Sequence, residues 1–178
     1  IKQAIDVTTR GFRKVLRMVK PGVAEYEVEA EWAKEFIRRR SKFAYTPIVA
    51  SGENACVLHY LQNDQICKKG DLLLMDVGAC YANYNADLTR TIPVSGKFTR
   101  RQKQVYNSVL RVLRQSINNA TVGKSLKEWQ TDSHFAELKD AQMMKERLSI
   151  LTSDMGYRDD VVGKFFSIEY INKKNISI

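Results

Sequence analysis

The stretch 70–91 constrains the fold of this chain more than any other, because it places two acids in what looks like a β-hairpin. Residues 71–75 form a short apolar run after a Lys-Gly turn signal, which predicts a buried strand, and residues 85–94 are the predicted return strand. Asp76 and Asp87 lie at equal distances from the middle of the predicted turn. A symmetric hairpin would therefore set them directly opposite each other on one face.

Two facing carboxylates need a positive partner, because like charges across a ladder repel and both acids cannot stay ionised in a poorly solvated site. A divalent cation is one candidate, since carboxylate oxygens are hard ligands for Mg, Mn, Co or Zn. Arg90 is the rival partner, and a hairpin with two solvated aspartates is the plainer alternative. The position of Asp76 directly after a core strand favours the metal, because an acid placed there needs a reason.

Helices are predicted on both sides of this hairpin. Apolar residues at three- and four-residue spacings predict a helix over 1–19 and a second one from Glu25 to the basic cluster 38–40. The apolar stripes comprise Ile1, Ile5, Thr8, Phe12, Val15, Leu16 and Val19 in the first helix, and Val28, Trp32, Phe36 and Ile37 in the second. Residues 43–50 read as a strand interrupted at Pro47.

The second half of the chain repeats the helical opening of the first. Capping boxes at 99–102 and 125–128 predict two helices, the later one running towards Leu148, and Gly123 separates them as Gly22 separates the first pair. A second acid hairpin should follow, but the sequence ends before one could be built. The chain is therefore expected to hold one full half of a duplicated fold and the helical start of another.

Composition indicates an ordinary globular protein with 44% hydrophobic and 28% charged residues. The net charge of +9 could suit an acidic partner, but the basic residues are spread over helix faces without interleaved aromatic residues, so no nucleic-acid partner is expected. No apolar run approaches the length of a membrane span, so no membrane partner is expected either. Cys56, Cys67 and Cys80 form no CxxC pattern and read as reduced thiols, which predicts a cytoplasmic location.

Two segments carry a resemblance to a known family: AYTPIVASGENACVLHY at 44–60 and GDLLLMDVGACYANYNADLTRTIPVSGKFT at 70–99. They closely resemble the proline-specific metallo-aminopeptidases (aminopeptidase P, or Xaa-Pro aminopeptidase), which belong with prolidase and methionine aminopeptidase to the "pita-bread" superfamily. The resemblance implies a partial metallopeptidase catalytic domain over 1–166 and leaves 167–178 as an unmatched tail. It implies an α/β (α+β) pita-bread fold, with an antiparallel sheet and outer helices.

The resemblance also implies a site with two divalent metal ions, most often Mn, with Co or Zn as alternatives. Asp76 matches an aspartate that binds one metal ion, and Asp87 matches a carboxylate that bridges both. His59 matches a catalytic histidine that orients the substrate and shuttles protons. Arg90 matches no ligand and is expected to support the Asp87 strand by a charge-assisted bond, while His134 is expected to be structural.

The sequence departs from this pattern after Phe166. The family continues into a His-Gly signature and two strands that each bring a Glu, whereas here Ser-Ile-Glu-Tyr follows and the chain stops at Ile178. Three of the five metal ligands are then absent. The chain is expected to be a truncated domain that is a poor or inactive peptidase by itself.

The leading functional expectation is a metallo-aminopeptidase that releases the N-terminal residue from peptides with proline in second position. The alternative is a non-catalytic pita-bread binding module for peptide, histone or nucleic acid; retention of both aspartates and His59 argues against it. A third reading is a folding fragment whose unpaired sheet edge drives association. Related enzymes are commonly dimers, so a homodimer is expected by analogy.

Overall fold

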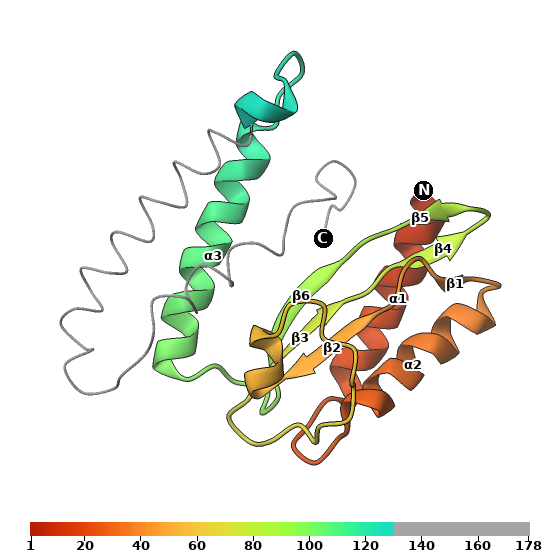
Figure 1. Cartoon of the computed structure of the whole chain (residues 1–178), viewed down its shortest axis with the longest axis vertical. Helices are drawn as coiled ribbons and strands as arrows, with labels where there is room; N and C mark the ends of the chain where they lie inside the picture. The colour runs from red at the N-terminus through yellow and green to blue at the C-terminus, as the bar shows by residue number, and fades with distance from the viewer. Residues whose placement is uncertain (130–178) are drawn as a thin grey trace. The chain divides into compact units, whose positions relative to one another are not determined.

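The computed structural model describes residues 1–129, which fall into two compact units. The first unit comprises residues 1–99, and the second begins at Arg100 (Figure 1). The predicted helix towards Leu148, His134 and the tail 167–178 lie outside the described residues.

The first unit contains two helices and two small antiparallel sheets. The helices are α1 (Lys2–Met18) and α2 (Glu25–Arg38). One sheet has the order β2 (Ile48–Ser51), β3 (Leu72–Asp76), β6 (Thr89–Pro93), and the other has the order β1 (Lys42–Phe43), β4 (Ala79–Tyr81), β5 (Tyr84–Asn85). A short 3₁₀ helix, η1 (Gly52–Cys56), follows β2. The predicted helices are confirmed, and the strand predicted over 43–50 is split near Pro47 into β1 and β2.

The buried face of α1 differs from the predicted stripe. Ile1 and Leu16 are 60% and 46% exposed, so their predicted burial is wrong. The reason is a close helix contact: a Cβ on Gly11 would lie 2.6 Å from Cε3 of Trp32, so α1 approaches α2 along its glycine face. The residues that α1 buries are Ala4, Val7, Thr8, Gly11 and Val15.

The face of α2 follows the prediction except at its end. Val28, Trp32 and Phe36 recur every four residues and are almost fully buried, whereas Ile37 is 72% exposed because it lies on the neighbouring helix face. The ring of Trp32 stacks on Phe12 and meets Phe36 edge to face. These helix side chains share one core with the strand residues Val49, Leu73, Met75 and Ala79, and with Val77 and Val94, which directly follow β3 and β6.

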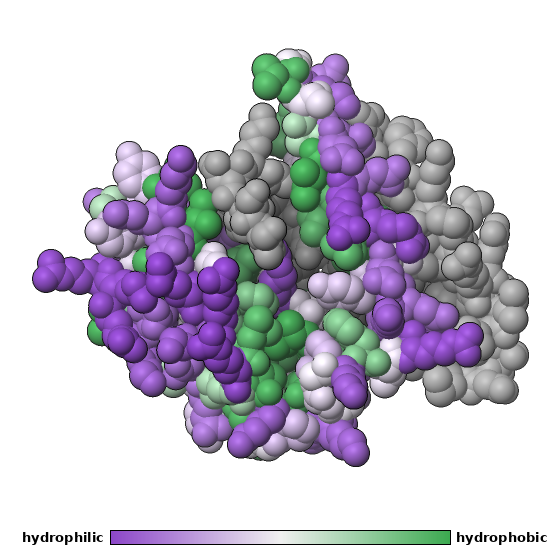
Figure 2. Space-filling view, turned by 180° about the vertical axis from the view of Figure 1, so that it is seen from behind, coloured by the Kyte–Doolittle hydropathy of each residue, from purple (hydrophilic) through white to green (hydrophobic). Residues whose placement is uncertain are grey.

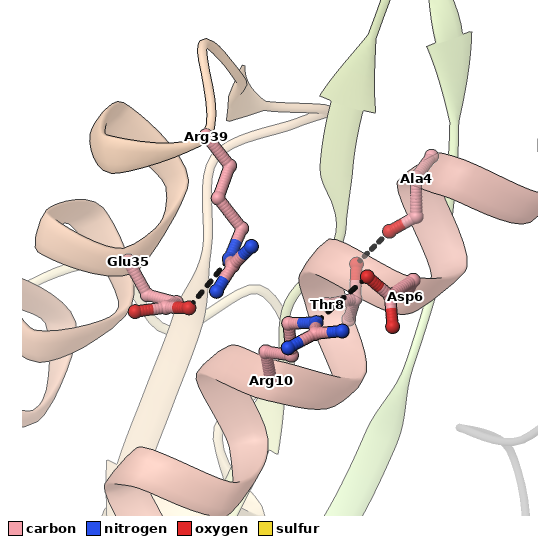
Figure 3. Close-up of polar contacts among 6 residues, drawn as sticks. All are labelled: Ala4, Asp6, Thr8, Arg10, Glu35 and Arg39. Carbon is pink, nitrogen blue, oxygen red and sulfur yellow. Dashed lines mark hydrogen bonds and ion pairs between the residues drawn. The ribbon is translucent and has the colours of Figure 1, made fainter.

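Thr8 ties α1 to the β1-β4-β5 sheet through a buried hydroxyl. Its Oγ1 donates to the carbonyl of Ala4 at 2.8 Å and accepts from the backbone N–H of Ala79 at 3.0 Å. Figure 3 shows the bond to Ala4 together with two ion pairs on the helices, Asp6 with Arg10 and Glu35 with Arg39. The strand N–H is thus satisfied inside the core, where an unpaired donor would be unfavourable.

Charged side chains occupy much of the outer surface of this unit, beside exposed apolar residues such as Ile37 and Leu58. Figure 2 shows hydrophilic side chains crowded over much of the side opposite to that seen in Figure 1. Exposed basic residues on α1 include Arg10, Arg13, Lys14 and Arg17. This distribution agrees with the expected spread of basic residues over helix faces.

The second unit contains α3 (Arg100–Asn119) and the start of a further helix. Gly123 adopts φ +93°, close to the +96° of Gly22 between α1 and α2, and both values are in the left-handed region that favours glycine. The predicted capping box at 125–128 is confirmed: Glu128 N–H donates to Ser125 Oγ at 3.3 Å, and Ser125 N–H donates to Glu128 Oε2 at 2.8 Å. The helix–glycine–helix opening therefore recurs in the described residues, as the sequence repeat predicts.

Candidate functional site

Tyr45 brings the two predicted metal ligands together. Its hydroxyl oxygen lies 2.7 Å from Oδ1 of Asp76 and 3.1 Å from Oδ1 of Asp87. The tyrosine sits between β1 and β2, where the N–H of Ala44 donates to the carbonyl of Gly78 at 2.8 Å. Two carboxylates from different parts of the chain therefore converge on a single phenolic oxygen.

The strand register explains why the aspartates meet, and it corrects the predicted hairpin. Asp76 lies opposite Thr89, not opposite Asp87. The N–H of Val77 donates to the carbonyl of Leu88, and the same register continues into β4 and β5, which places Asp87 beside Gly78. The aspartates are thus diagonal neighbours on one face of the ladder, still within reach of a long side chain such as tyrosine.

The turn is the physical reason for this difference. The prediction centred it between Tyr81 and Ala82, whereas Tyr81 pairs with Tyr84 around a two-residue turn formed by Ala82 and Asn83. Both turn residues have positive φ, 48° and 65°, as a two-residue hairpin of the I′ kind requires. The one-position shift of the turn moves every cross-strand pair by two residues. The predicted return strand is also divided between the two sheets.

Gly78 allows the strand that carries Asp87 to approach closely. A Cβ at this position would lie 1.8 Å from the carbonyl oxygen of Ala86 and 3.2 Å from Cα of Asp87. No side chain fits in that space without a shift of the backbone. Glycine is therefore required at position 78 for Asp87 to lie where it does relative to Asp76.

The alternating pattern of β3 places Asp76 on the sheet face turned away from α1 and α2. Leu73 and Met75 belong to the core shared with the two helices, so Asp76, one residue further on, points to the opposite face. Asp76 and Asp87 are both partly buried. The acid pair is thus outside the helix-covered core.

The electrostatics of the pair favour an added positive charge. Burial raises the pKa of Asp87, the charge of Asp76 raises it further, and the hydrogen bond from Tyr45 acts in the opposite direction. Burial, followed by the contacts with the two carboxylates, also raises the pKa of Tyr45, so its hydroxyl is a neutral donor at pH 7. A cation between the carboxylates would favour the ionised form of Asp87.

Arg90 directs its guanidinium to its own strand. Nη1 donates to the carbonyl of Thr89 at 2.7 Å, next to the pairing of Thr89 with Asp76. This is a charge-assisted bond to the preceding residue of β6, and support of the Asp87 strand by Arg90 stays a prediction. Its acceptor is a backbone carbonyl and not a carboxylate.

The donor set suits a hard divalent ion but is incomplete among the described residues. Carboxylate oxygens of Asp76 and Asp87 point at a common region, as ligands for Mn, Co, Mg or Zn should. Within residues 1–129, no group of three or more His, Cys, Asp or Glu side chains could hold a metal ion. The two aspartates can thus contribute to a metal site without forming a whole one.

His59 lies on an exposed turn after η1, apart from any partner. Within the described part of the chain, its imidazole makes no hydrogen bond or ion pair. Its φ of +52° is in the left-handed region, which is uncommon for a residue other than glycine and is enriched at functional sites. The structure thus joins two of the three predicted site residues. Within residues 1–129 no hydrogen bond links His59 to them, so its catalytic role stays a prediction.

Glu25 was not predicted as part of any site, yet its side chain accepts more hydrogen bonds than any other acid among the described residues. Its side chain is fully buried at the first turn of α2. It accepts hydrogen bonds from the N–H and Oγ of Ser51, the side-chain amide of Asn54, the hydroxyl of Tyr60 and the N–H of Gln65. Burial and the bond to Glu25 raise the pKa of Tyr60 to about 12.

No simple sequence signal identifies Tyr45 or Glu25. An acid in the first turn of a helix is ordinary, because it complements the helix dipole, so Glu25 looks like a cap. Its partners lie 26 to 40 residues further along the chain. Tyr45 precedes Pro47 in an interrupted strand, and only the folded register shows that it meets two acids.

The thiols of the described residues fit the composition-based expectation. Cys56, Cys67 and Cys80 are all free. Among residues 1–129, none of the helices has the length and apolar character needed to cross a bilayer.

Comparison with known proteins places this arrangement in a family. The model of metallopeptidase family M24 matches residues 1–136. A second model, of the bacteriophage T4-like portal protein, matches residues 97–177, which is less than half of the chain. The two matches overlap from residue 97 to residue 136.

Three relatives illustrate the likeness. The Xaa-Pro aminopeptidase of Haemophilus influenzae is 40% identical over 129 residues, which cover 72% of this chain and 30% of the relative. Among solved structures, an aminopeptidase P from Bacillus anthracis has a TM-score of 0.77 at 36% identity, covering 89% of this chain and 36% of that one. An Escherichia coli aminopeptidase P variant in complex with substrate has a TM-score of 0.75 at 33% identity, with coverages of 92% and 36%. The chain thus spans about a third of the length of these relatives, and the predicted α/β pita-bread fold is confirmed.

Proposed function

This chain belongs to metallopeptidase family M24, and from that membership we propose that it forms part of a metal-dependent Xaa-Pro aminopeptidase. The substrate would be a peptide with proline in second position, from which the enzyme releases the N-terminal residue. The relatives support this choice, since several bear the name Xaa-Pro aminopeptidase. The observation that carries the proposal is the convergence of Asp76 and Asp87 on the hydroxyl of Tyr45.

Asp76 and Asp87 would hold two divalent ions, with Mn as the first choice and Co or Zn as alternatives. Bound metals of this kind lower the pKa of water and polarise the scissile carbonyl. The remaining ligands that the family resemblance implies, one His and two Glu, are not among the described residues that surround the pair. We therefore expect the 178-residue chain by itself to be a poor or inactive peptidase.

In this proposal, Tyr45 orients the two aspartates that would bind the metal ions. Its neutral hydroxyl can donate to either carboxylate, which orients the Oδ1 atoms of Asp76 and Asp87 towards one region. This orientation matters because metal ligands are held in place by the hydrogen bonds that they make with neighbouring residues. His59, exposed on its turn, would orient the peptide and move a proton, as the resemblance implies.

Metal binding is the direct test of the proposed role of the two aspartates. Titration of the chain with MnCl₂, followed by calorimetry or by the electron paramagnetic resonance of free Mn²⁺, should show binding that Asp76→Asn and Asp87→Asn each weaken at least about tenfold. Asp71→Asn is the matched control, because Asp71 precedes the same strand but accepts from the N–H of Lys68 instead. Equal Mn²⁺ binding by all three variants would contradict the assignment.

Peptidase activity tests the substrate. A longer version of the chain that carries the His and Glu ligands should hydrolyse an Xaa-Pro peptide in the presence of Mn²⁺. Absence of turnover by such a folded protein would refute the enzymatic proposal. Salt-sensitive binding of DNA, RNA or histone without metal dependence would instead favour the non-catalytic binding module.

We also propose a partial catalytic domain over 1–166 followed by a tail over 167–178, a cytoplasmic location and a homodimer. Size-exclusion chromatography with light scattering would test the last of these.

A further inference from the structure

The side chain of Glu25 accepts its hydrogen bonds from a single region of the chain. Oε1 accepts from Ser51 N–H at 2.6 Å and Ser51 Oγ at 2.8 Å, and Oε2 accepts from the Tyr60 hydroxyl at 2.8 Å and Gln65 N–H at 3.1 Å. The backbone N–H of Glu25 in turn donates to the carbonyl of Gln65 at 2.9 Å. One buried side chain therefore binds both ends of the segment 51–65.

The segment between these ends has little structure of its own. Beyond η1, residues 57–65 form neither helix nor strand. Val57, Leu58 and Leu61 are exposed, as is His59, whereas the ring of Tyr60 is turned inward and only 5% exposed. Tyr60 is therefore the anchor of the turn, and Glu25 is the group to which it is anchored.

The chemistry of Glu25 makes this anchor specific. Its partners all approach as donors, which suits an ionised carboxylate, and its place in the first turn of α2 adds the favourable helix dipole. An amide in its place would turn an NH₂ group towards one pair of donors. Buried donors left without an acceptor are unfavourable, so the segment would shift to satisfy them.

Strand β2 connects the residues bound to Glu25 with the strand that carries Asp76. Ser51 is the last residue of β2, and the same strand pairs with β3 through Ser51 with Leu73 and Ile48 with Asp76. The carboxylate that holds Ser51 thus sets one end of a strand whose other end lies beside Asp76. The turn with His59 and the strand beside Asp76 share Glu25 as a common support.

We propose that Glu25 is a positioning residue that fixes the His59 turn relative to the Asp76–Asp87 pair. The inference rests on the proposed catalytic role of His59, and Glu25 itself does not touch the reacting groups. It acts through Ser51, Tyr60 and Gln65. The function of the buried acid is therefore to hold an exposed histidine in one place on a segment without regular secondary structure.

The variant Glu25→Gln tests this proposal, with Glu35→Gln as the matched control. Both glutamates lie on α2 and are almost fully buried, but Glu35 pairs with Arg39 on its own helix, as Figure 3 shows. Three measurements on the 178-residue chain follow the segment: the imidazole NMR signal of His59, amide hydrogen exchange at Ser51 and Gln65, and chymotryptic cleavage after Leu58 and Leu61. His59 and His134 are the only histidines, so a His134→Gln background leaves one imidazole signal.

Glu25→Gln should shift or broaden the His59 signal and raise exchange and cleavage in the segment about tenfold above the control, because bonds to a charged group are among the stronger ones. Equal changes in both variants, or none in either, would overturn the proposal. None of these measurements uses metal or peptide, so failure of the proposed peptidase activity would show separately.

Tyr60→Phe keeps the test decisive if Glu25→Gln fails to fold. This variant removes the hydroxyl that joins the turn to Glu25 and that also contacts Asn54 and Asp64 within the segment. Exposed Tyr26→Phe is its control. A moved His59 signal with faster cleavage in Tyr60→Phe alone would support the anchor. A His59 signal identical in Tyr60→Phe and Tyr26→Phe would refute it.

Discussion

Replacing Gly78 with alanine tests whether close approach of two backbone segments sets the place of Asp87. The added Cβ would lie 1.8 Å from the carbonyl oxygen of Ala86, where ordinary van der Waals contact begins near 3.4 Å. The neighbouring atom is backbone, so it cannot rotate away as a side chain would. The two segments must separate by more than about 1 Å, as the contact distances of packed atoms require.

The expected loss of stability follows from the bonds that flank this contact. The N–H of Val77 donates to Leu88 at 3.0 Å, and the N–H of Ala86 donates to Ala79 at 2.9 Å. Weakening two such bonds costs about 1–3 kcal/mol, and forced separation in a packed region adds about 1–3 kcal/mol. Gly78→Ala should therefore lower the free energy of unfolding by about 2–6 kcal/mol.

The control is Gly70→Ala. Gly70 has φ +96° and nothing within 4 Å of its built Cβ, so the replacement strains the backbone without a clash. That strain costs about 1–2 kcal/mol. Comparing the stability loss of the two variants separates the effect of the backbone contact at Gly78 from the effect of losing a glycine.

Urea unfolding followed by tryptophan fluorescence measures the difference. The chain has two tryptophans, so a Trp129→Phe background makes Trp32, in the core of the first unit, the only reporter. With a slope of about 1–3 kcal/mol per molar urea, Gly78→Ala should lower the midpoint by roughly 1 M or more. A midpoint equal to that of Gly70→Ala would refute the argument that the backbone contact at Gly78 is tight.

Two further variants test other parts of the structure. The pKa of Asp87 is raised in the folded state, so its contribution to stability is present at low pH and is lost as the pH rises through that pKa. Asp87→Asn should therefore stabilise the metal-free chain by up to about 1 kcal/mol at pH 7 and by nothing near pH 3. Thermal unfolding in EDTA measures this difference. A stabilisation that does not change with pH would contradict this. Thr8→Val should lower the free energy of unfolding by about 1–3 kcal/mol, because the buried N–H of Ala79 loses its acceptor. Thr9→Val, at the neighbouring position on α1, is the control. Equal urea midpoints for the two variants would count against the role of the Thr8 hydroxyl.

Helices and the central strand could be predicted from the sequence because their signals are local. The apolar periodicity of 1–19 and the capping box at 125–128 act within a few residues, and the structure confirms both. The apolar run before Asp76 likewise predicted β3 to within one residue. The buried face of α1 was partly wrong because Gly11, which periodicity ignores, sets the contact with α2.

The pairing of distant residues could not be predicted in the same way. A turn of Ala82 and Asn83 carries no glycine to signal positive φ, so the register of Asp76 and Asp87 was predicted two residues away from its true place. Their shared face was nevertheless correct, because a shift of two residues preserves the alternation of a strand. The bonds of Tyr45 and of Glu25 join residues 26 to 42 positions apart, and no local pattern encodes them.

The chain treats its partly buried and buried acids in two different ways, and the contrast supports a metal at only one of them. Glu25 receives its donors from the protein itself, through two backbone N–H groups and three side chains. The Tyr45 hydroxyl offers one proton to two neighbouring carboxylates, Asp76 and Asp87, and burial and the charge of Asp76 raise the pKa of Asp87. A dication between these two carboxylates would lower their electrostatic free energy, which is what a metal-binding face requires.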